Sequence, residues 1–234
     1  MNYANPDDLN ETQWLGEHLG DPKVKVLDAS FHLPSTGRDV ETEFSQRHIP
    51  GAMLFDIDDV SDHGVPLPHM LPSAAAFSGH MGVLGIGNDD LVVIYDVHGV
   101  QTSPRAWWTF RAFGHKKVAV LNGGLPKWLA ENRPTSDDIA DPPRAVFRAK
   151  LIAARVRNID QMLANQESRA ALVLDARPAG RFVGADPEPR DGIRSGHMPG
   201  SVNLPIGKFI DSRTKTFLPA DGLLTALADI RVDP

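Results

Sequence analysis

The sequence predicts an α/β fold made of two successive copies of one domain, each with a central parallel sheet flanked by helices. Three observations predict it. Short apolar runs alternate with amphipathic stretches along the whole chain, which is the pattern of layered α/β proteins. Two short motifs recur in the same order about 148 residues later. A segment rich in proline and aspartate separates the two copies, as expected for a linker.

The elements of the first copy follow from the local pattern of residues. Runs of aliphatic and β-branched residues predict strands, and amphipathic stretches behind a serine, an aspartate or a proline predict helices. In chain order, we expect a strand at 23–28, a helix at 39–46, a strand at 52–57, a helix from Ser73, a strand at 91–95, a helix from Pro104 with Ser103 as N-cap, a strand at 117–121 and a helix from Pro126.

The repeat defines the expected domains. The sequence VLDA at 26–29 recurs at 173–176, an offset of 147 residues, and HIPGA at 48–52 recurs as HMPGS at 197–201, an offset of 149. We therefore expect an N-terminal domain at 1–132, a linker at 133–156 and a C-terminal domain at 157–234.

The second copy is expected to be incomplete. Only 37 residues follow His197, whereas the first copy continues from His48 through further strands and helices to Trp128. The counterpart of Asp96, which ends the strongest strand of the first copy, would fall at about position 244. The expectation is that the natural protein is longer and that a strand-to-helix loop of the second copy lies beyond Pro234.

That loop matters because a strand-to-helix loop directs backbone N–H groups and the positive end of a helix at its centre. A cysteine in such a loop has a lowered pKa and is a reactive thiolate. The first copy has Asp96 at this position. We interpret Asp96 as structural, an aspartate that ends a strand and caps a loop.

Composition excludes several classes of protein. The net charge is −6 and no basic stripe is present, so we expect no nucleic-acid partner. No apolar run reaches the length of a membrane span, and the first twenty residues are not a signal segment, so we expect a cytoplasmic protein without a membrane partner. The absence of cysteine excludes a disulfide, a zinc-thiolate site and a thiol nucleophile within these 234 residues.

Several motifs resemble one family. The sequences HIPGA, FDID, VVIYD, SPRAWW and LNGGLPKW resemble the N-terminal half of rhodaneses and 3-mercaptopyruvate sulfurtransferases. The sequences VLDAR, GRFVG, PEPRDGI and GHMPGSVNLP resemble the start of their C-terminal half. The resemblance, from about Val26 to Pro205, implies two tandem rhodanese-like domains, the second of which carries the catalytic cysteine.

The resemblance also implies functional residues. Arg181 and Arg190 would bind the carboxylate and the ketone of the substrate, since two guanidinium groups can hold an α-keto acid. Asp58 would orient His69 for proton transfer. By spacing alone, the two arginines could equally be surface ion-pair partners, and a histidine in a proline-rich loop could be a packed, hydrogen-bonded residue. The presence of Arg190, Asp58 and His69 favours mercaptopyruvate as donor, whereas residues 62–66 depart from the family pattern.

Residues that recur in both copies are interpreted as structural, because one copy is expected to be inactive. These are Asp28, Asp175, His48 and His197. Trp107, Trp108 and Phe110 are expected in the core, and the remaining histidines show no metal-ligand spacing.

The resemblance implies a sulfurtransferase that moves the sulfur of 3-mercaptopyruvate, or of thiosulfate, through a cysteine persulfide. The acceptor would be a thiol, such as thioredoxin, or cyanide, and no metal or organic cofactor is implied. The cysteine would lie beyond Pro234, so the 234-residue chain itself is expected to be inactive. The alternatives are a thiosulfate-preferring rhodanese and a non-catalytic rhodanese-like binding module. A rhodanese-fold phosphatase is less favoured.

Overall fold

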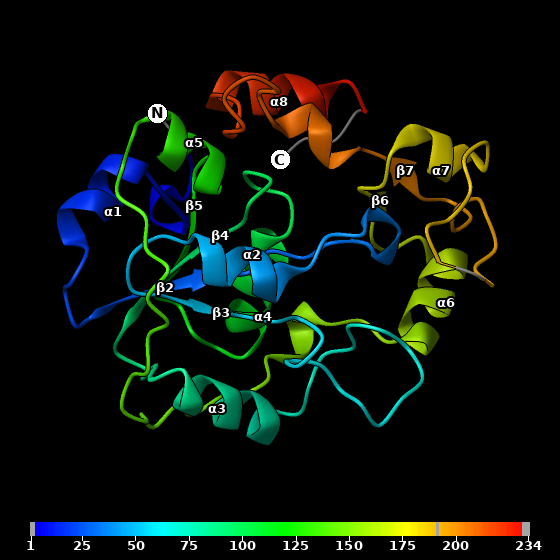
Figure 1. The fold of residues 1–234 in the computed structure, drawn as a ribbon. Coiled ribbons are helices and arrows are strands. Elements are labelled where there is room, and N and C mark those ends of the chain that lie inside the picture. The colour runs from blue at the N-terminus through cyan, green and yellow to red at the C-terminus, as the bar shows by residue number, and fades with distance from the viewer. Residues whose placement is uncertain (1–2, 191, 231–234) are drawn as a thin grey trace. The chain divides into compact units, whose positions relative to one another are not determined.

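A computed structural model of the chain describes residues 3–190 and 192–230 (Figure 1). Asp191, in the PEPRDGI motif, lies outside the described residues. The chain forms two compact units. The N-terminal unit contains Asn5–Ala153 with Thr214–Thr216, and the C-terminal unit contains Ala154–Arg213 and Phe217–Pro234 with Met1–Ala4.

The N-terminal unit has a parallel sheet of five strands in the order β1-β5-β4-β2-β3. The strands are β1 (Leu9–Asn10), β2 (Val24–Asp28), β3 (Ala52–Leu54), β4 (Leu91–Tyr95) and β5 (Val118–Leu121). Four of them were expected from the sequence. The edge strand β1 was not, because two residues are too few to show an alternating pattern.

Helices cover this sheet, and all but α1, which was not expected from the sequence, begin close to the expected residues. They are α1 (Thr12–His18), α2 (Val40–Gln46), α3 (Ala74–Val83), α4 (Ser103–Ala112) and α5 (Gly124–Ala130), with short 3₁₀ helices at Pro6–Asp8 and Pro34–Thr36. Asp39 caps α2 and Ser73 caps α3, because each side chain accepts a hydrogen bond from a backbone N–H of the first turn. The expected N-cap of α4 was wrong by one residue. The helix begins at Ser103 after Thr102, since the Ser103 hydroxyl donates to Asp96 at 2.7 Å.

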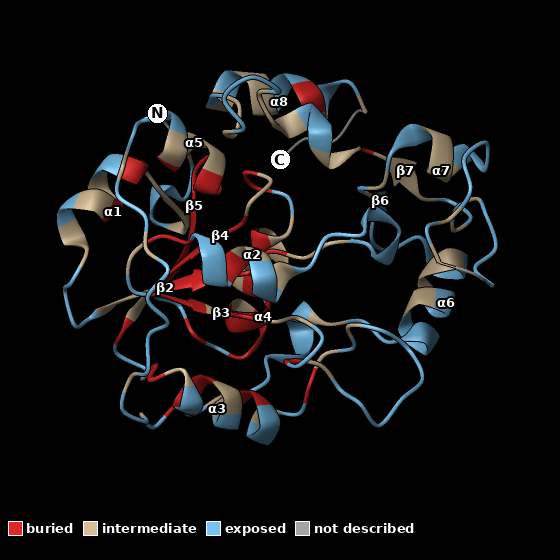
Figure 2. Cartoon of the chain, in the orientation of Figure 1, coloured by how far each residue is buried: buried red, intermediate tan, exposed pale blue. Residues whose placement is uncertain are grey.

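Two apolar clusters form the core of the N-terminal unit, one on each face of the sheet (Figure 2). Successive residues of a strand point to opposite faces, so Val26 joins the cluster under α1, α2 and α5, and Leu27 joins the cluster under α3 and α4. Phe110 of α4 is fully buried, as expected. Both faces of this parallel sheet are covered, which explains why β4 is a continuous apolar run.

The segment expected as a linker lies along the N-terminal unit up to Ala153. Ser136 and His48 exchange two backbone hydrogen bonds of 2.9 Å, and Phe147 is buried in the cluster under α3 and α4. The expectation rested on the proline-rich composition of 132–144. The segment is ordered because its backbone pairs with the unit and because Phe147 follows the prolines.

The C-terminal unit repeats part of the same architecture. Its elements are α6 (Ile159–Ser168), β6 (Leu174–Asp175), α7 (Ala179–Val183), β7 (Val202–Asn203) and α8 (Ala220–Ala228), with a 3₁₀ helix at Ile206–Phe209. A further 3₁₀ helix, Ala153–Arg155, begins at the last residue of the N-terminal segment. Strands β6 and β7 are parallel, with Leu174 opposite Val202. In the N-terminal unit, Leu27 of β2 lies opposite Met53 of β3 in the same way. The sequence repeat is therefore also a repeat of strand pairing and register.

The repeated histidines have the same structural role in both units. His48 Nδ1 donates to the Phe44 carbonyl at 2.7 Å, and its ring stacks on Phe44 with centroids 4.2 Å apart. His197 Nδ1 donates to the Phe182 carbonyl at 2.7 Å, and its ring stacks on Phe182 at 3.8 Å. Each histidine thus ties its motif to a helix, α2 in one unit and α7 in the other.

The repeated aspartates also correspond. Asp28 accepts the backbone N–H of Ser30 at 2.9 Å, and Asp175 accepts the backbone N–H of Arg177 at 3.0 Å. Each carboxylate thus closes the turn that follows the first strand of its motif. No helix in the described part of the chain is long and apolar enough to cross a membrane.

Candidate active site

Asp58 and His69 lie together in the N-terminal unit, on the loops between β3 and α3. The distance from His69 Nε2 to Asp58 Oδ1 is 2.9 Å. The Asp58 side chain is 64% exposed, whereas that of His69 is 19% exposed. The backbone N–H of Asp58 donates to Asp56 at 2.7 Å, which fixes the loop that presents the carboxylate. The carboxylate can therefore hold the imidazole in one orientation.

The backbone of His69 is held in an uncommon conformation. Its φ is +56°, in the left-handed region that side chains other than glycine rarely adopt. Arg105 of α4 donates from Nη2 to the His69 carbonyl at 2.6 Å. The ring of Phe31 meets the imidazole edge to face, with centroids 4.8 Å apart. These contacts, made by residues far apart in the sequence, fix the position of the imidazole.

A cavity of about 170 Å³ adjoins His69 within the N-terminal unit. Its wall combines apolar side chains with a few polar ones. The residues that line it include Phe31, Phe55, Ile57, Gln101, Thr102 and Arg105.

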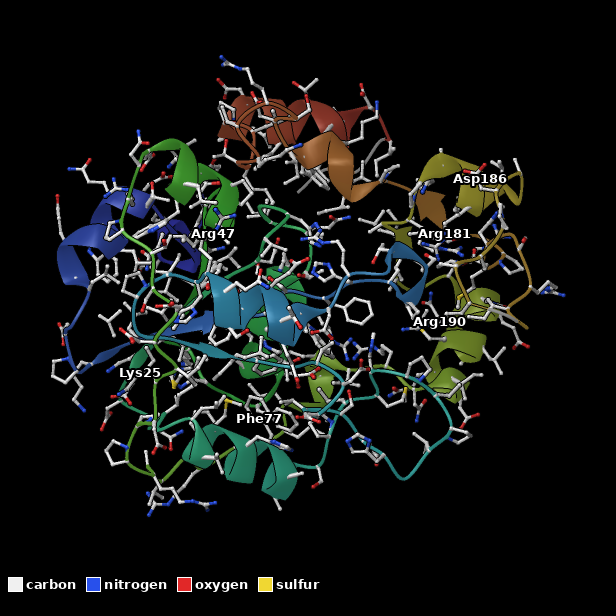
Figure 3. The ribbon with its side chains drawn as sticks, viewed as in Figure 1. Lys25, Arg47, Phe77, Arg181, Asp186 and Arg190 are labelled. Atoms are coloured by element: carbon white, nitrogen blue, oxygen red, sulfur yellow. The ribbon has the colours of Figure 1, made fainter. Side chains whose placement is uncertain are left out.

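Arg181 and Arg190 lie in the C-terminal unit (Figure 3). Both are partly buried. Arg181 lies on α7 and donates from Nε to Glu188 at 3.1 Å and also from Nη2. Arg177 donates from Nη1 to the other oxygen of Glu188 at 2.8 Å and pairs with Asp175 at 2.6 Å. These side chains therefore form a row of alternating charges that begins at Arg181 and ends at Asp175, the last residue of β6.

Glu188 is the residue that sequence reasoning missed at this site. Its side chain is only 3% exposed, and the hydrogen bond from Arg181 lowers its pKa. The signal was available, since Glu188 and Arg190 belong to the same PEPR motif. Glu188 takes the Nε–Nη2 edge of Arg181, so Nη1 is the edge left for a ligand.

The model of the family described as "Rhodanese-like domain" matches residues 11–131. The human "3-mercaptopyruvate sulfurtransferase" is 48% identical over 208 residues, which cover 86% of this chain and 70% of that protein. The chain belongs to the rhodanese family of sulfurtransferases.

Other members of the rhodanese family are similar along most of their length. Bovine "Thiosulfate sulfurtransferase" is 43% identical over 209 residues, 86% of this chain and 70% of that protein. The crystal structure of SseA from Escherichia coli, which is described as a 3-mercaptopyruvate sulfotransferase, is also similar. It has a TM-score of 0.88 at 33% identity, and the match covers 97% of this chain and 84% of that one. Relatives named for either donor therefore share this fold.

The strand-to-helix loop of the N-terminal rhodanese-like domain is occupied by its own aspartate. Asp96 is fully buried, and its Oδ2 accepts the backbone N–H groups of Gln101, Thr102 and Ser103 at 2.8–2.9 Å. Its Oδ1 accepts the backbone N–H of His98 at 2.8 Å. Asp96 thus fills a cradle of donors that suits an anion, which agrees with its interpretation as structural.

Among the described residues, no group of three or more acidic or histidine side chains could hold a metal ion.

Proposed function

We propose that this protein transfers the sulfur of 3-mercaptopyruvate to a thiol acceptor or to cyanide. In the first step a cysteine thiolate attacks the donor sulfur, the carbon–sulfur bond breaks, and the pyruvate enolate leaves and takes up a proton. In the second step the acceptor attacks the outer sulfur of the cysteine persulfide and releases the thiolate. The thiol lies outside these 234 residues, because they contain no cysteine.

The observation that carries the proposal is the pair of Asp58 and His69, with 2.9 Å between carboxylate and imidazole. In the first step His69 gives a proton to the enolate carbon, and in the second it takes the proton of the acceptor thiol. Asp58 holds the imidazole in one orientation and stabilises its charged form. Arg181 and Arg190 bind the carboxylate and the ketone of the donor, for which Arg181 has its Nη1 edge available.

Two alternatives have their own support. A thiosulfate donor is favoured by the bovine and chicken relatives named thiosulfate sulfurtransferase, both 43% identical to this chain. A non-catalytic binding module is favoured by the absence of cysteine from these residues. A cytoplasmic location stays a prediction, since the name of the relative from Arabidopsis thaliana includes "mitochondrial".

The test compares the product of the complete reading frame with the 234-residue chain, using 3-mercaptopyruvate and thiosulfate as donors. We expect only the complete product to form pyruvate and to gain the mass of one sulfur atom. Arg190→Ala should lower kcat/KM for 3-mercaptopyruvate about 100-fold, since two charge-assisted hydrogen bonds are lost, with a smaller loss for thiosulfate.

Arg157→Ala is the matched control, because Arg157 is exposed in the same unit and, among the described residues, donates only to backbone carbonyls of its own segment. Equal losses with both donors in Arg190→Ala would contradict the donor assignment. A complete product that forms no persulfide with either donor would overturn the sulfurtransferase proposal and favour the binding module.

A further inference from the structure

Arg105 is a partly buried cation that pairs with no carboxylate among the described residues. No aspartate or glutamate in the described part of the chain lies within ion-pair distance of its guanidinium group. The group donates from Nη2 to the His69 carbonyl and stacks on Trp108, 4.8 Å from the ring centroid. Its Nε is buried and has no hydrogen-bond partner. A buried charge in this state is costly unless an anion completes its contacts.

Arg105 also lines the cavity of about 170 Å³ beside His69. Gln101, on the same wall, has an exposed side chain that makes no hydrogen bond to another described residue. The Thr102 hydroxyl donates to the Ala29 carbonyl at 2.8 Å, so the donors left for a ligand are those of Arg105 and Gln101. None of the described residues that line this cavity carries a carboxylate.

The remaining walls define the rest of the ligand. Phe31, Phe55 and Ile57 are apolar, so the cavity suits a small anion that also has an apolar part. A volume of about 170 Å³ holds on the order of six non-hydrogen atoms at the density of liquid water, about 30 Å³ each. A short carboxylate with a thiol at its other end meets both conditions.

We propose that Arg105 is the cation of a subsite, in the N-terminal unit, that binds small anionic thiols as sulfur acceptors. The proposal rests on the function proposed above, which assigns the carboxylate of the donor to Arg181 and Arg190. The carboxylate of the acceptor pairs with Arg105 and Gln101, and its thiol points to His69. His69 then takes the thiol proton as the acceptor sulfur attacks the persulfide.

The test uses two thiols of similar size, mercaptoacetate, which carries a carboxylate, and 2-mercaptoethanol, which is neutral. Each is titrated into the 234-residue chain while the indole N–H resonance of Trp108 is followed by NMR. This measures binding and needs no turnover, so it can succeed even if the sulfurtransferase proposal fails. We expect saturable binding of mercaptoacetate, and binding of 2-mercaptoethanol that is about 10- to 100-fold weaker.

Arg105→Met should weaken the binding of mercaptoacetate about 10- to 100-fold, because the charge is lost while the side-chain volume is kept. Arg111→Met is the matched control. Arg111 lies on the same helix and stacks on Trp107 at 5.6 Å, but it pairs with Asp8 and does not line the cavity. Its loss should leave binding unchanged.

If Arg105→Met does not fold, Gln101→Ala tests the same subsite from an exposed position. It should weaken the binding of mercaptoacetate about threefold or more. The complete product provides the kinetic readout. There Arg105→Met should raise KM for mercaptoacetate at least about 10-fold more than KM for 2-mercaptoethanol, because both thiols depend on His69 but only mercaptoacetate has a carboxylate. The proposal would be overturned if neither Arg105→Met nor Gln101→Ala altered the binding of mercaptoacetate. It would also be overturned if neither thiol shifted the Trp108 resonance.

Discussion

At the scale of single residues, the donors around Asp96 would serve any anion at that position. Three backbone N–H groups and the Ser103 hydroxyl converge on Oδ2 at 2.7–2.9 Å. We therefore expect Asp96→Cys to give a thiol whose pKa lies below the usual value of about 8.5, close to about 7. The chain has no other cysteine, so the ultraviolet absorbance of the thiolate as a function of pH reports this one group without a reagent having to reach the buried side chain.

Ser35→Cys is the control for this measurement, because Ser35 is exposed in the N-terminal unit. Its thiol should titrate close to the usual value. Equal titration midpoints for the two variants would show that the loop donors do not stabilise a thiolate, and would remove the argument that this kind of loop activates a cysteine in the family.

His115 makes a second prediction at this scale. Its side chain is buried against Phe110 and Phe147, its Nε2 donates to the Lys117 carbonyl at 2.9 Å, and burial lowers its pKa. The unfolded chain has the higher histidine pKa of about 6.5 and so takes up the proton first as the pH falls. The stability from neutral His115 is thus complete above about pH 6.5 and declines below it, by at most about 1.4 kcal/mol per pH unit.

The measurement is the free energy of unfolding in urea between pH 7.5 and 5.5. His115→Gln keeps a hydrogen-bond donor but does not titrate, so its pH dependence should be flatter than that of the unchanged protein. His63→Gln is the control, since His63 is exposed. If His63→Gln changed the slope of unfolding free energy against pH as much as His115→Gln does, the pH dependence would belong to groups other than His115.

At the scale of elements, the sequence predicted best where burial is complete. Strand β4 has the expected bounds, because a strand covered on both faces is an uninterrupted apolar run. Helix α5 begins at Gly124, two residues before the expected Pro126, because Gly123 and Gly124 have φ of 84° and 50° and open the turn. Such a turn depends on the backbone conformation of two glycines, which the spacing of apolar residues in the sequence does not show.

The candidate site shows the same limit. Asp58, His69, Arg181 and Arg190 could be named from motifs, and the first two lie in contact. The contacts of Arg105 with His69 and of Glu188 with Arg181 and Arg177 were not foreseen. Arg105 and His69 are 36 residues apart, and a contact at that separation depends on how α4 and the loop before α3 meet. No local pattern encodes it.

At the scale of the whole molecule, the two units bury very different amounts of apolar surface. Both edges of β2 are paired, with β3 and β4, whereas within the described residues β6 pairs only with β7. Among the described residues of the C-terminal unit, only Leu204 and Ala226 are buried. Leu163, Leu172 and Leu174 are 53%, 54% and 44% exposed.

We therefore expect the C-terminal unit to open more readily than the N-terminal unit in the 234-residue chain. Amide hydrogens of β2, β4 and β5 should exchange at least about 100-fold more slowly than those of β6 and β7, a difference of about 3 kcal/mol in opening free energy. Hydrogen exchange followed by mass spectrometry on the intact chain measures this. Val93→Ala should raise exchange in the N-terminal unit, because Val93 is fully buried, and Leu174→Ala should change little. Equal protection in both units would show that they open together, and that the C-terminal unit is stabilised by more than its own core.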